Sequence, residues 1–236
     1  HSMGAMYGYI YEGTYKLDDF NKSGNSYTLK SNVPFYTSEA NTQPGMPKYR
    51  DLNGDGVINT NDCTFIGNGL PTHTGGFTNN FNYRDFDFSF FFQWSYGNDI
   101  LNANRLMFES SWNRTRELNQ FASYADRWTI DNPTSNIPRA TSSSSNRVFS
   151  SRIIEDGSFL RLKTLTLGYT VPRKAISRVG IDQLRIYFAA QNLFTISNYS
   201  GYDPEVSIRE SALTPGLDFS AYPRARSFSF GINLGF

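Results

Sequence analysis

The sequence predicts an all-β protein whose strands belong to a transmembrane barrel, and three observations lead to that fold class. Segments of about ten residues alternate apolar and polar side chains, which gives each strand one apolar face. Short turns alternate with long polar loops along the chain. Aromatic residues make up 16% of the sequence although the chain is polar on average, a combination that suits strands with a lipid-facing side.

The alternation is clearest in the segment 226–236. Its apolar side chains share one face and its small polar side chains share the other, because successive side chains of a strand point to opposite faces. A barrel is expected to end on such a strand, since the last strand must pair with the first and face lipid. The apolar face comprises Phe228, Phe230, Ile232, Leu234 and Phe236.

A predicted hairpin carries a row of five aromatic residues. The segments 75–83 and 86–96 both alternate and are separated only by Arg84 and Asp85, which predicts two antiparallel strands joined by a tight turn. The second of these segments places its aromatic side chains on one face. They are Phe86, Phe88, Phe90, Phe92 and Trp94.

The segment 158–171 also reads as a strand, but its apolar residues change face near Lys163–Thr164, which predicts a β-bulge there. A Tyr-rich first segment and a segment after a short turn complete the set of six strands. The strands are predicted at residues 7–17, 75–83, 86–96, 158–171, 183–194 and 226–236.

Three long polar loops are predicted, at residues 18–74, 97–157 and 195–225. Loops of this length are uncommon in compact soluble domains. They are usual on the outer side of outer-membrane barrels, whose other side carries short turns. The pattern therefore predicts an outer-membrane location with the long loops outside the cell, and helical turns are expected within the second loop.

Composition excludes several classes of protein. The formal net charge is +1, from 22 Lys and Arg against 21 Asp and Glu, which gives no support for nucleic-acid binding. No apolar run of about 18 residues exists, so no transmembrane helix is expected. Cys63 is the single cysteine, so no intrachain disulfide can form. The opening HSMGAM lacks the features of a signal peptide, and the numbering is expected to begin inside a longer natural chain.

No catalytic residues are predicted. The two histidines are far apart in the sequence, and no zinc-protease, nucleophile-elbow, P-loop or dinucleotide motif is present. The sequence therefore indicates a protein that is not an enzyme. Aromatic residues of the loops could stack on sugar rings or pack the loops together, and packing is the expected role for each one. They include Trp112, Trp128, Tyr199 and Tyr202.

An acidic loop at residues 51–62 reads D-L-N-G-D-G-V-I-N-T-N-D and matches the twelve-residue EF-hand calcium loop. Ca²⁺ takes about six to eight hard oxygen ligands, and this spacing directs the ligands to one point. Asp62 stands where Glu is usual, so bidentate binding there is less assured. The candidate ligands are Asp51, Asn53, Asp55, the Val57 carbonyl, Asn59 and Asp62.

Two further positions of the acidic loop fit the same pattern. Gly56 lies where the backbone must turn sharply, and Ile58 is expected to pack inward. Structural Ca²⁺ is favoured over Mg²⁺, and an Asn/Asp/Gly-rich turn without metal is the alternative. Dockerin modules use a similar pattern with Asp at position 12. A single loop without flanking helices suits neither catalysis nor a calcium sensor.

Several stretches together identify a family. They read Y-G-Y-I-Y-E-G-T-Y, P-K-Y-R-D-L-N-G-D-G-V-I-N with I-G-N, F-F-F-Q-W-S-Y-G-N-D-I, R-W-T-I-D-N-P-T-S-N-I-P-R, I-E-D-G-S-F-L-R-L-K-T-L-T-L-G-Y and Q-N-L-F-T-I-S-N-Y-S-G-Y-D-P-E, followed by the aromatic end. In this order they resemble the C-terminal part of the SusC/RagA family of TonB-dependent outer-membrane transporters of Bacteroidetes. The resemblance covers nearly the whole chain.

The resemblance implies about the last six strands of a barrel of about 22 strands. It also implies import of glycans or peptides together with a SusD-like surface lipoprotein, energised through TonB. The plug domain and TonB box have no counterpart in these residues. The rest of the barrel and the plug would then come from the same polypeptide or from a separate chain, with outer-membrane lipid around them.

Two alternatives stay open at the level of sequence. A soluble β-sandwich could bury the aromatic row of the segment 86–96, but each remaining strand would need a matching inner face. In that case the chain would be a calcium-stabilised carbohydrate-binding or dockerin-like interaction module, recoverable without detergent. An outer-membrane enzyme would need a catalytic cluster. The sequence does not identify a substrate or substrate-binding residues.

Overall fold

The structure is a computed structural model that describes residues 2–110, 118–141, 148–177, 180–206 and 214–236. The chain divides into two compact units, each built from three segments of the sequence. The first, which we call the sheet unit, comprises residues 71–99, 156–206 and 222–236. The second, which we call the loop unit, comprises residues 1–70, 100–155 and 207–221.

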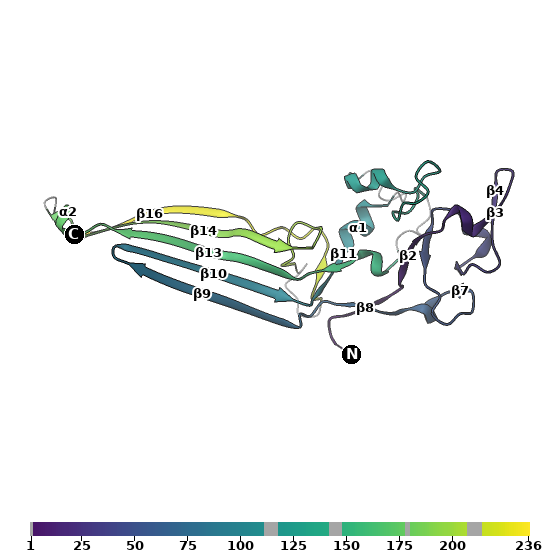
Figure 1. The fold of residues 1–236 in the computed structure, drawn as a ribbon, viewed down its shortest axis with the longest axis horizontal. Helices are drawn as coiled ribbons and strands as arrows, with labels where there is room; N and C mark the ends of the chain where they lie inside the picture. Colours follow the sequence, from purple (N-terminus) through teal and green to yellow (C-terminus); the bar gives the residue numbers. More distant parts are fainter. Residues whose placement is uncertain (1, 111–117, 142–147, 178–179, 207–213) are drawn as a thin grey trace. The chain divides into compact units, whose positions relative to one another are not determined.

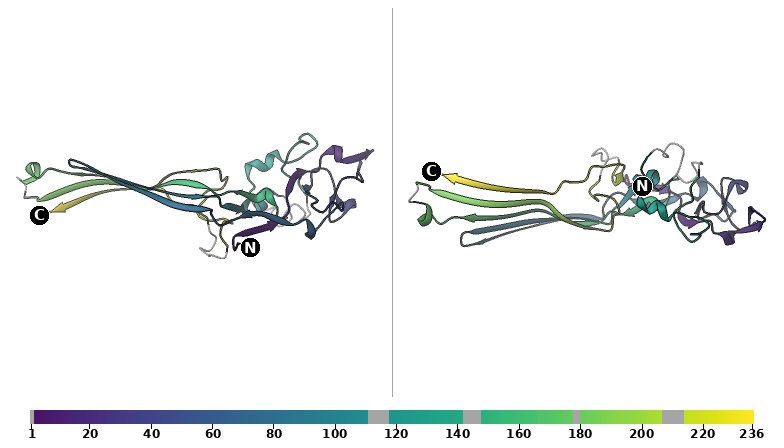
Figure 2. Two further views of the ribbon diagram at one scale, coloured as in Figure 1. Left: turned by 60° about the horizontal axis from the view of Figure 1, so that its bottom comes forward. Right: turned by 90° about the horizontal axis from the view of Figure 1, so that it is seen from above.

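Five long antiparallel strands form the sheet unit, in the order β16-β14-β13-β10-β9 (Figure 1). Strands that follow one another in this unit are also neighbours in the sheet, so the topology is a meander. The strands twist along their length (Figure 2), as strands of L-amino acids do. They are β9 (His73–Tyr83), β10 (Phe86–Tyr96), β13 (Phe159–Thr170), β14 (Gln183–Ser197) and β16 (Ser227–Gly235).

Short connections lie at one end of this sheet. Arg84, with a φ of 55°, and Asp85 form the tight turn between β9 and β10, as the sequence predicts. A segment that contains the short helix α2 (Arg173–Ile176) joins β13 to β14. At the other strand ends the chain continues in sequence into segments of the loop unit. These ends are the starts of β9, β13 and β16 and the ends of β10 and β14.

The strand register places apolar residues side by side across the whole sheet. Phe88 lies opposite Phe81 and Leu167, and Phe188 lies opposite Leu167 and Phe230. The ring centroids of Phe188 and Phe230 are 4.9 Å apart. Phe81 is 51% and Phe230 is 81% exposed, so the described part of the chain leaves this apolar face open.

The opposite face of the sheet is polar and carries an ion pair that spans β13. Arg185 donates from Nε to Asp87 Oδ1 at 3.0 Å and from Nη2 to Asp87 Oδ2 at 2.6 Å. Gly168 lies beneath the pair, and a Cβ there would fall 2.3 Å from Asp87 Oδ1. The missing side chain at this position therefore makes room for the pair.

The predicted β-bulge is confirmed. The pairing of β10 with β13 shifts register between Phe91 and Phe92, which lie opposite Thr164 and Leu162. Lys163 is the inserted residue, and its Nζ donates to Gln93 Oε1 at 2.6 Å. Leu162 and Leu165 consequently both lie on the apolar face although they are three residues apart, and Lys163 lies on the polar face.

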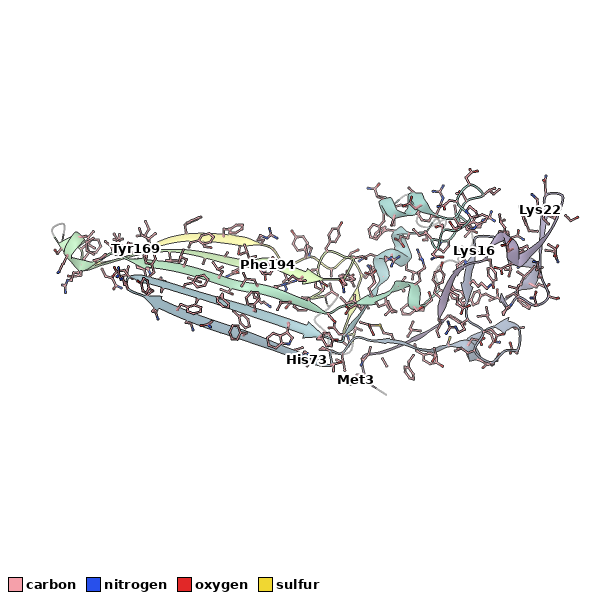
Figure 3. All side chains as sticks on the ribbon, in the orientation of Figure 1. Met3, Lys16, Lys22, His73, Tyr169 and Phe194 are labelled. Carbon is pink, nitrogen blue, oxygen red and sulfur yellow. The ribbon has the colours of Figure 1, made fainter. Side chains whose placement is uncertain are left out.

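Aromatic clusters mark both ends of the sheet. At one end the rings of Phe86 and Tyr169 are 4.6 Å apart, and at the other His73 stacks on Tyr96 and accepts from Trp94 Nε1 at 3.2 Å. Figure 3 labels Tyr169 and His73 near these opposite ends. Rings of this kind border the apolar band of membrane barrels.

Among the described residues, no helix is both long and apolar enough to cross a membrane.

The loop unit consists of short strand pairs and helical turns. Four pairs are antiparallel or parallel two-stranded ladders, and a fifth group has three strands in the order β12-β11-β15. The pairs are β1 (Ala5–Gly8) with β8 (Thr64–Asn68), β2 (Tyr11–Thr14) with β6 (Pro47–Tyr49), β3 (Phe20–Ser23) with β4 (Ser26–Leu29), and β5 (Phe35–Tyr36) with β7 (Val57–Ile58), and the triple is β12 (Ile154–Asp156), β11 (Asp99–Asn102) and β15 (Leu217–Asp218).

Helical turns and three small cores complete the loop unit. The helices are α1 (Ala103–Phe108) and the 3-10 turns η1 (Leu17–Asp19), η2 (Glu39–Asn41), η3 (Thr60–Asp62), η4 (Ala122–Asp126) and η6 (Ser151–Ile153). Each core is a cluster of three buried residues. The clusters are Met6, Leu101 and Ile153; Tyr9, Tyr49 and Ile58; and Tyr15, Phe20 and Leu29.

The first predicted barrel strand, at 7–17, is wrong. This segment forms two short strands of the loop unit, which break after Gly8 and pair with different partners. A Cβ on Gly8 would lie 2.7 Å from the Phe149 carbonyl oxygen, and Gly13 has a φ of 101°. These glycines bend the segment, so the sheet unit has five long strands where the sequence predicts six.

The other long strands lie within three residues of their predicted ends. The predicted loops at 18–74, 97–157 and 195–225 contain most of the loop unit, and they are therefore folded segments with their own strands and cores. The helical turns expected in the second of these loops are present as α1 and η4.

Replacing Gly168 with Ala should destabilise the sheet unit, because the new Cβ would force Asp87 and Arg185 apart. Overpacking of this kind costs about 1–3 kcal/mol. Thermal unfolding of the full-length protein in detergent measures the effect. Gly235→Ala is the control, since its Cβ would make an ordinary contact of 3.5 Å with Gln183 Cβ. Equal melting temperatures for the two variants would contradict this expectation.

Candidate functional site

The acidic loop at 51–62 is the site that the sequence predicts, and two local features shape it. Gly56 has a φ of 82°, which provides the sharp turn expected at that position. β7 then pairs in parallel with β5, and this pairing places Ile58 opposite Tyr36. Ile58 is completely buried, as its predicted inward packing requires.

Carboxylates of the acidic loop accept hydrogen bonds from the loop's own backbone. Asp51 accepts from the Gly54 N–H through Oδ1 at 2.7 Å and from the Gly56 N–H through Oδ2 at 2.8 Å. Asp55 Oδ1 accepts from the Val57 N–H at 2.8 Å. Each of these oxygens uses one lone pair in this way and keeps another for a further partner.

Asp62 closes the acidic loop. It is completely buried, and its two oxygens accept from the backbone N–H groups of Leu52 and Asn59, each at 2.8 Å. Burial acts to raise the pKa of Asp62, but the hydrogen bonds from these N–H groups outweigh it, so the pKa is lowered overall. The carboxyl group of Asp51 is a close neighbour of this group.

Two side-chain amides occupy the remaining predicted ligand positions. Asn53 Nδ2 donates to Asp55 Oδ2 at 2.9 Å, and Asn59 Nδ2 donates to the Val57 carbonyl at 2.9 Å. The oxygens of these amides accept from the backbone N–H groups of Asp55 and Asn61, at 3.0 and 2.9 Å, and each oxygen keeps a second lone pair. The same positions can therefore present oxygen to a cation.

The acidic loop is negatively charged, but its carboxylates do not all converge on one point. Its carboxylates form no ion pair within the described residues. Across the described ranges, no group of three His, Cys, Asp or Glu side chains is close enough together to hold a metal ion. The structure brings Asp51 and Asp62 together, whereas the Asp55 carboxylate accepts from the Val57 N–H and from the Asn53 side-chain amide.

A second charged cluster lies on the polar face of the sheet unit, and the sequence does not predict it. Arg161 of β13 is 2% exposed and bonds Asp203, and its Nη1 lies 2.9 Å from Glu205 Oε2. Its Nε donates to Thr195 Oγ1 at 2.9 Å. The segment after β14 therefore folds back onto the sheet and is fixed there by a buried arginine.

Neighbouring groups complete this cluster. Lys163 Nζ lies 3.1 Å from Glu205 Oε1, and the Arg224 N–H donates to Asp203 Oδ2 at 2.8 Å. Burial acts to raise the pKa of Asp203, but hydrogen bonds from Arg161 and from the backbone hold it below its usual value. A signal for this cluster was present in the sequence, because alternation places Arg161 on the polar face of its strand.

The loop aromatic residues have different surroundings. Trp128 and Tyr199 are buried, which agrees with a packing role. Tyr202 is 83% exposed, and Trp112 lies outside the described residues.

Comparisons with known proteins find relatives over the whole chain. The TonB-dependent receptor P3 of Formosa agariphila is 34% identical over 240 residues, which cover 100% of this chain and 22% of that receptor. The TonB-dependent receptor SusC of Bacteroides thetaiotaomicron is 30% identical over 200 residues, covering 84% of this chain and 18% of that protein. The chain thus spans about a fifth of the length of the curated relatives it matches. No protein-family model matches it.

A solved structure shares the fold. The RagAB peptide transporter superposes with a TM-score of 0.71 at 23% identity, covering 98% of this chain and 23% of that one. This likeness confirms the predicted all-β fold class. The relatives are receptors and transporters, not enzymes. The chain belongs to the SusC/RagA family of TonB-dependent receptors and corresponds to part of such a protein.

Proposed function

We propose that this chain is part of an outer-membrane active importer that takes up glycans or peptides with a SusD-like lipoprotein and is energised through TonB. The observation that carries the proposal is the five-stranded sheet with one open apolar face and one polar face. In an outer-membrane barrel the apolar face meets lipid and the polar face lines the interior. The row of Phe81, Phe88, Leu167, Phe188 and Phe230 has that arrangement.

The edges of the sheet support the same proposal. Among the described residues, no strand pairs with the outer edge of β9 or of β16. Unpaired backbone groups are not tolerated in lipid, so the sheet has to continue into further strands. The remainder of the barrel and its plug, in the same polypeptide or in a separate chain, would supply them.

The relatives support the mode of transport. They are named as TonB-dependent receptors, and the structural neighbour is a peptide transporter. Coupling to TonB and a lipoprotein lid are features that the whole receptor would carry. The soluble alternative gains no support from the sheet, because its apolar face has no covering layer in the described residues.

We further propose that the acidic loop holds a structural Ca²⁺. Its donors are all oxygens, which Ca²⁺ prefers, and Asp51 and Asp62 lie next to each other without a cationic side chain between them. Two neighbouring carboxylates repel each other, and a cation bound between them would remove that repulsion. The ligands would be Asp51, Asn53, Asp55, the Val57 carbonyl, Asn59 and Asp62, and Mg²⁺ fits less well because it demands a stricter octahedron.

Deleting the whole receptor should abolish growth on one member of a panel of pure oligosaccharides and peptides supplied as sole nutrient. Deleting TonB should cause the same loss, because uptake depends on the proton gradient. Growth on a monosaccharide is the control. Recovery of the receptor in the soluble fraction without detergent, or unchanged growth on every member of the panel, would overturn the importer proposal.

Ca²⁺ should protect the acidic loop of the full-length receptor from proteolysis, and Asp55→Ala should remove most of that protection. The expected reason is the loss of a charged ligand whose carboxylate is exposed and free of ion pairs in the described part of the chain. Asp18→Ala, at another exposed acidic residue outside the loop, is the matched control. Cleavage rates that do not respond to Ca²⁺ would count against the site.

Acidification should loosen the metal-free loop. Since the pKa of Asp62 is lowered by folding, its stabilising contribution is complete above the ordinary carboxyl pKa of about 3.9 and is lost as the pH falls through the lowered value. Hydrogen exchange of the Leu52 and Asn59 amides, corrected for intrinsic rates, should therefore be faster at about pH 3 than at about pH 6.

Asp62→Asn should remove most of this pH dependence and destabilise the loop at neutral pH by about 1–3 kcal/mol. Asp18→Asn is the control, because Asp18 lies outside the acidic loop. Equal protection of the two amides at both pH values in the unaltered receptor would refute the assigned role of Asp62.

A further inference from the structure

The loop unit contains a pocket of about 480 Å³ that neither the importer proposal nor the acidic loop explains. Pockets that hold small ligands have about 300–1,000 Å³. The segment 36–47 forms most of the wall, and Arg139 approaches it from a distant part of the sequence. The residues that carry the argument are Tyr15, Tyr36, Asn41, Thr42, Gln43 and Arg139.

Arg139 is held in place by groups outside the pocket lining. Its backbone N–H donates to the Gly45 carbonyl at 2.8 Å, and its Nη1 donates to the Pro44 carbonyl at 3.2 Å. Its guanidinium lies 5.9 Å from the centroid of the Trp128 ring, within the range of a cation–π contact. The charged group is thus fixed before any ligand arrives.

Gly45 makes this arrangement possible. Its φ of 82° is one that other residues rarely adopt, and a Cβ there would lie 2.4 Å from the ring of Trp128. Because Gly45 has no side chain, the Trp128 ring packs directly on its backbone. The stretch R-W-T-I-D-N-P-T-S-N-I-P-R, residues 127–139, therefore supplies both the arginine of the pocket and the ring on which that arginine rests.

The lining offers hydrogen-bond donors and acceptors that the chain does not use. Within the described residues, the side-chain amides of Asn41 and Gln43 have no hydrogen-bond partner. Thr42 Oγ1, in contrast, donates to the Ser38 carbonyl at 2.9 Å. Amides with both functions free are suited to the paired hydroxyl groups of a sugar ring.

The electrostatics of the lining favour an anion. Arg139 is its cationic residue, and no Asp or Glu belongs to the lining. A guanidinium attracts a carboxylate through its positive charge, and it retains that charge when some of its N–H groups already donate to other groups. Tyr15 and Tyr36 add aromatic surface, and the Tyr15 hydroxyl is already committed to the Pro34 carbonyl at 2.7 Å. The ring of Tyr15 thus contributes apolar wall, not a further donor.

We propose that this pocket binds a sugar unit that carries a carboxylate, as part of an anionic oligosaccharide. The inference rests on the proposed import function and names the substrate class of that function. Met46 and Pro47 add apolar surface beside the two tyrosines, so one face of a sugar ring can pack on this wall while its polar groups meet the amides and the arginine. A sugar acid uses the amides, the rings and the arginine together.

Binding to the purified full-length receptor tests the proposal by calorimetry. The probes are a trimer of galacturonic acid, the same trimer with its carboxyl groups reduced to alcohols, and an acidic tripeptide. The acidic trimer should bind about 10- to 100-fold more tightly than its reduced form, which is the value expected of one charged hydrogen-bonded pair.

Arg139→Gln should weaken binding of the acidic trimer by the same factor and leave the reduced trimer unaffected. Arg127→Gln is the matched control, because Arg127 also stacks on a ring, that of Tyr124, but lies outside the lining. Gln43→Ala should weaken both trimers, and this half-buried position, whose side-chain amide has no hydrogen-bond partner in the described residues, keeps the test valid if the arginine variant fails to fold.

Three outcomes would overturn the proposal. They are equal affinity of the acidic trimer for the unaltered receptor and Arg139→Gln, binding of the tripeptide alone, and no binding of any probe. Uptake measured by growth is independent of this pocket test. Intact uptake without trimer binding would overturn the pocket assignment alone, whereas loss of membrane association would overturn the importer proposal.

Discussion

The structure depends on one constraint, the strict period of two in the side-chain direction of paired strands. Because residues directly opposite each other share a face, the register of five strands turns alternation in the sequence into one continuous apolar face. A shift of one residue in any strand would move its apolar set to the polar side. The polar groups of the sheet are consequently confined to the other face.

Because the polar groups of the sheet share one face, that face is crowded. Small residues make room on it, and oppositely charged side chains pair with one another. Gly168 leaves room for the Asp87–Arg185 pair above it. Arg161 is almost fully buried, so its charge is tolerable only with Asp203 and Glu205 beside it. Removing one member of such a buried pair leaves an uncompensated charge, which typically costs about 3–5 kcal/mol. The returning segment after β14 is thereby tied to the sheet.

How much of this could be predicted from the sequence follows from the same constraint. The strands from β9 to β16 were predictable because alternation is a local property, and even the bulge at Lys163 is a visible change of phase. The error at 7–17 arose where alternation of Tyr with Gly is equally compatible with short, bent strands. Their partners, β8 and β6, lie more than thirty residues away in the sequence, since Thr14 pairs with Pro47 and Gly8 with Thr64. The acidic loop was visible because its spacing is local, whereas the pocket was not, since Arg139 meets Gly45 only through tertiary contacts.

The acidic loop and the pocket of the loop unit are connected by direct contacts, although the ligands proposed for them differ. β7 belongs to the acidic loop, and its Ile58 pairs with Tyr36 of β5, which lines the pocket. Tyr36 also packs on Tyr49, with ring centroids 5.3 Å apart, and Tyr49 ends the strand that leads into the acidic loop. A cation that makes the acidic loop rigid would therefore restrict Tyr36, in the wall of the pocket, through its contacts with Ile58 and Tyr49. Because coupling between sites is reciprocal, a ligand that orders this wall would in turn raise the affinity of the loop for the cation.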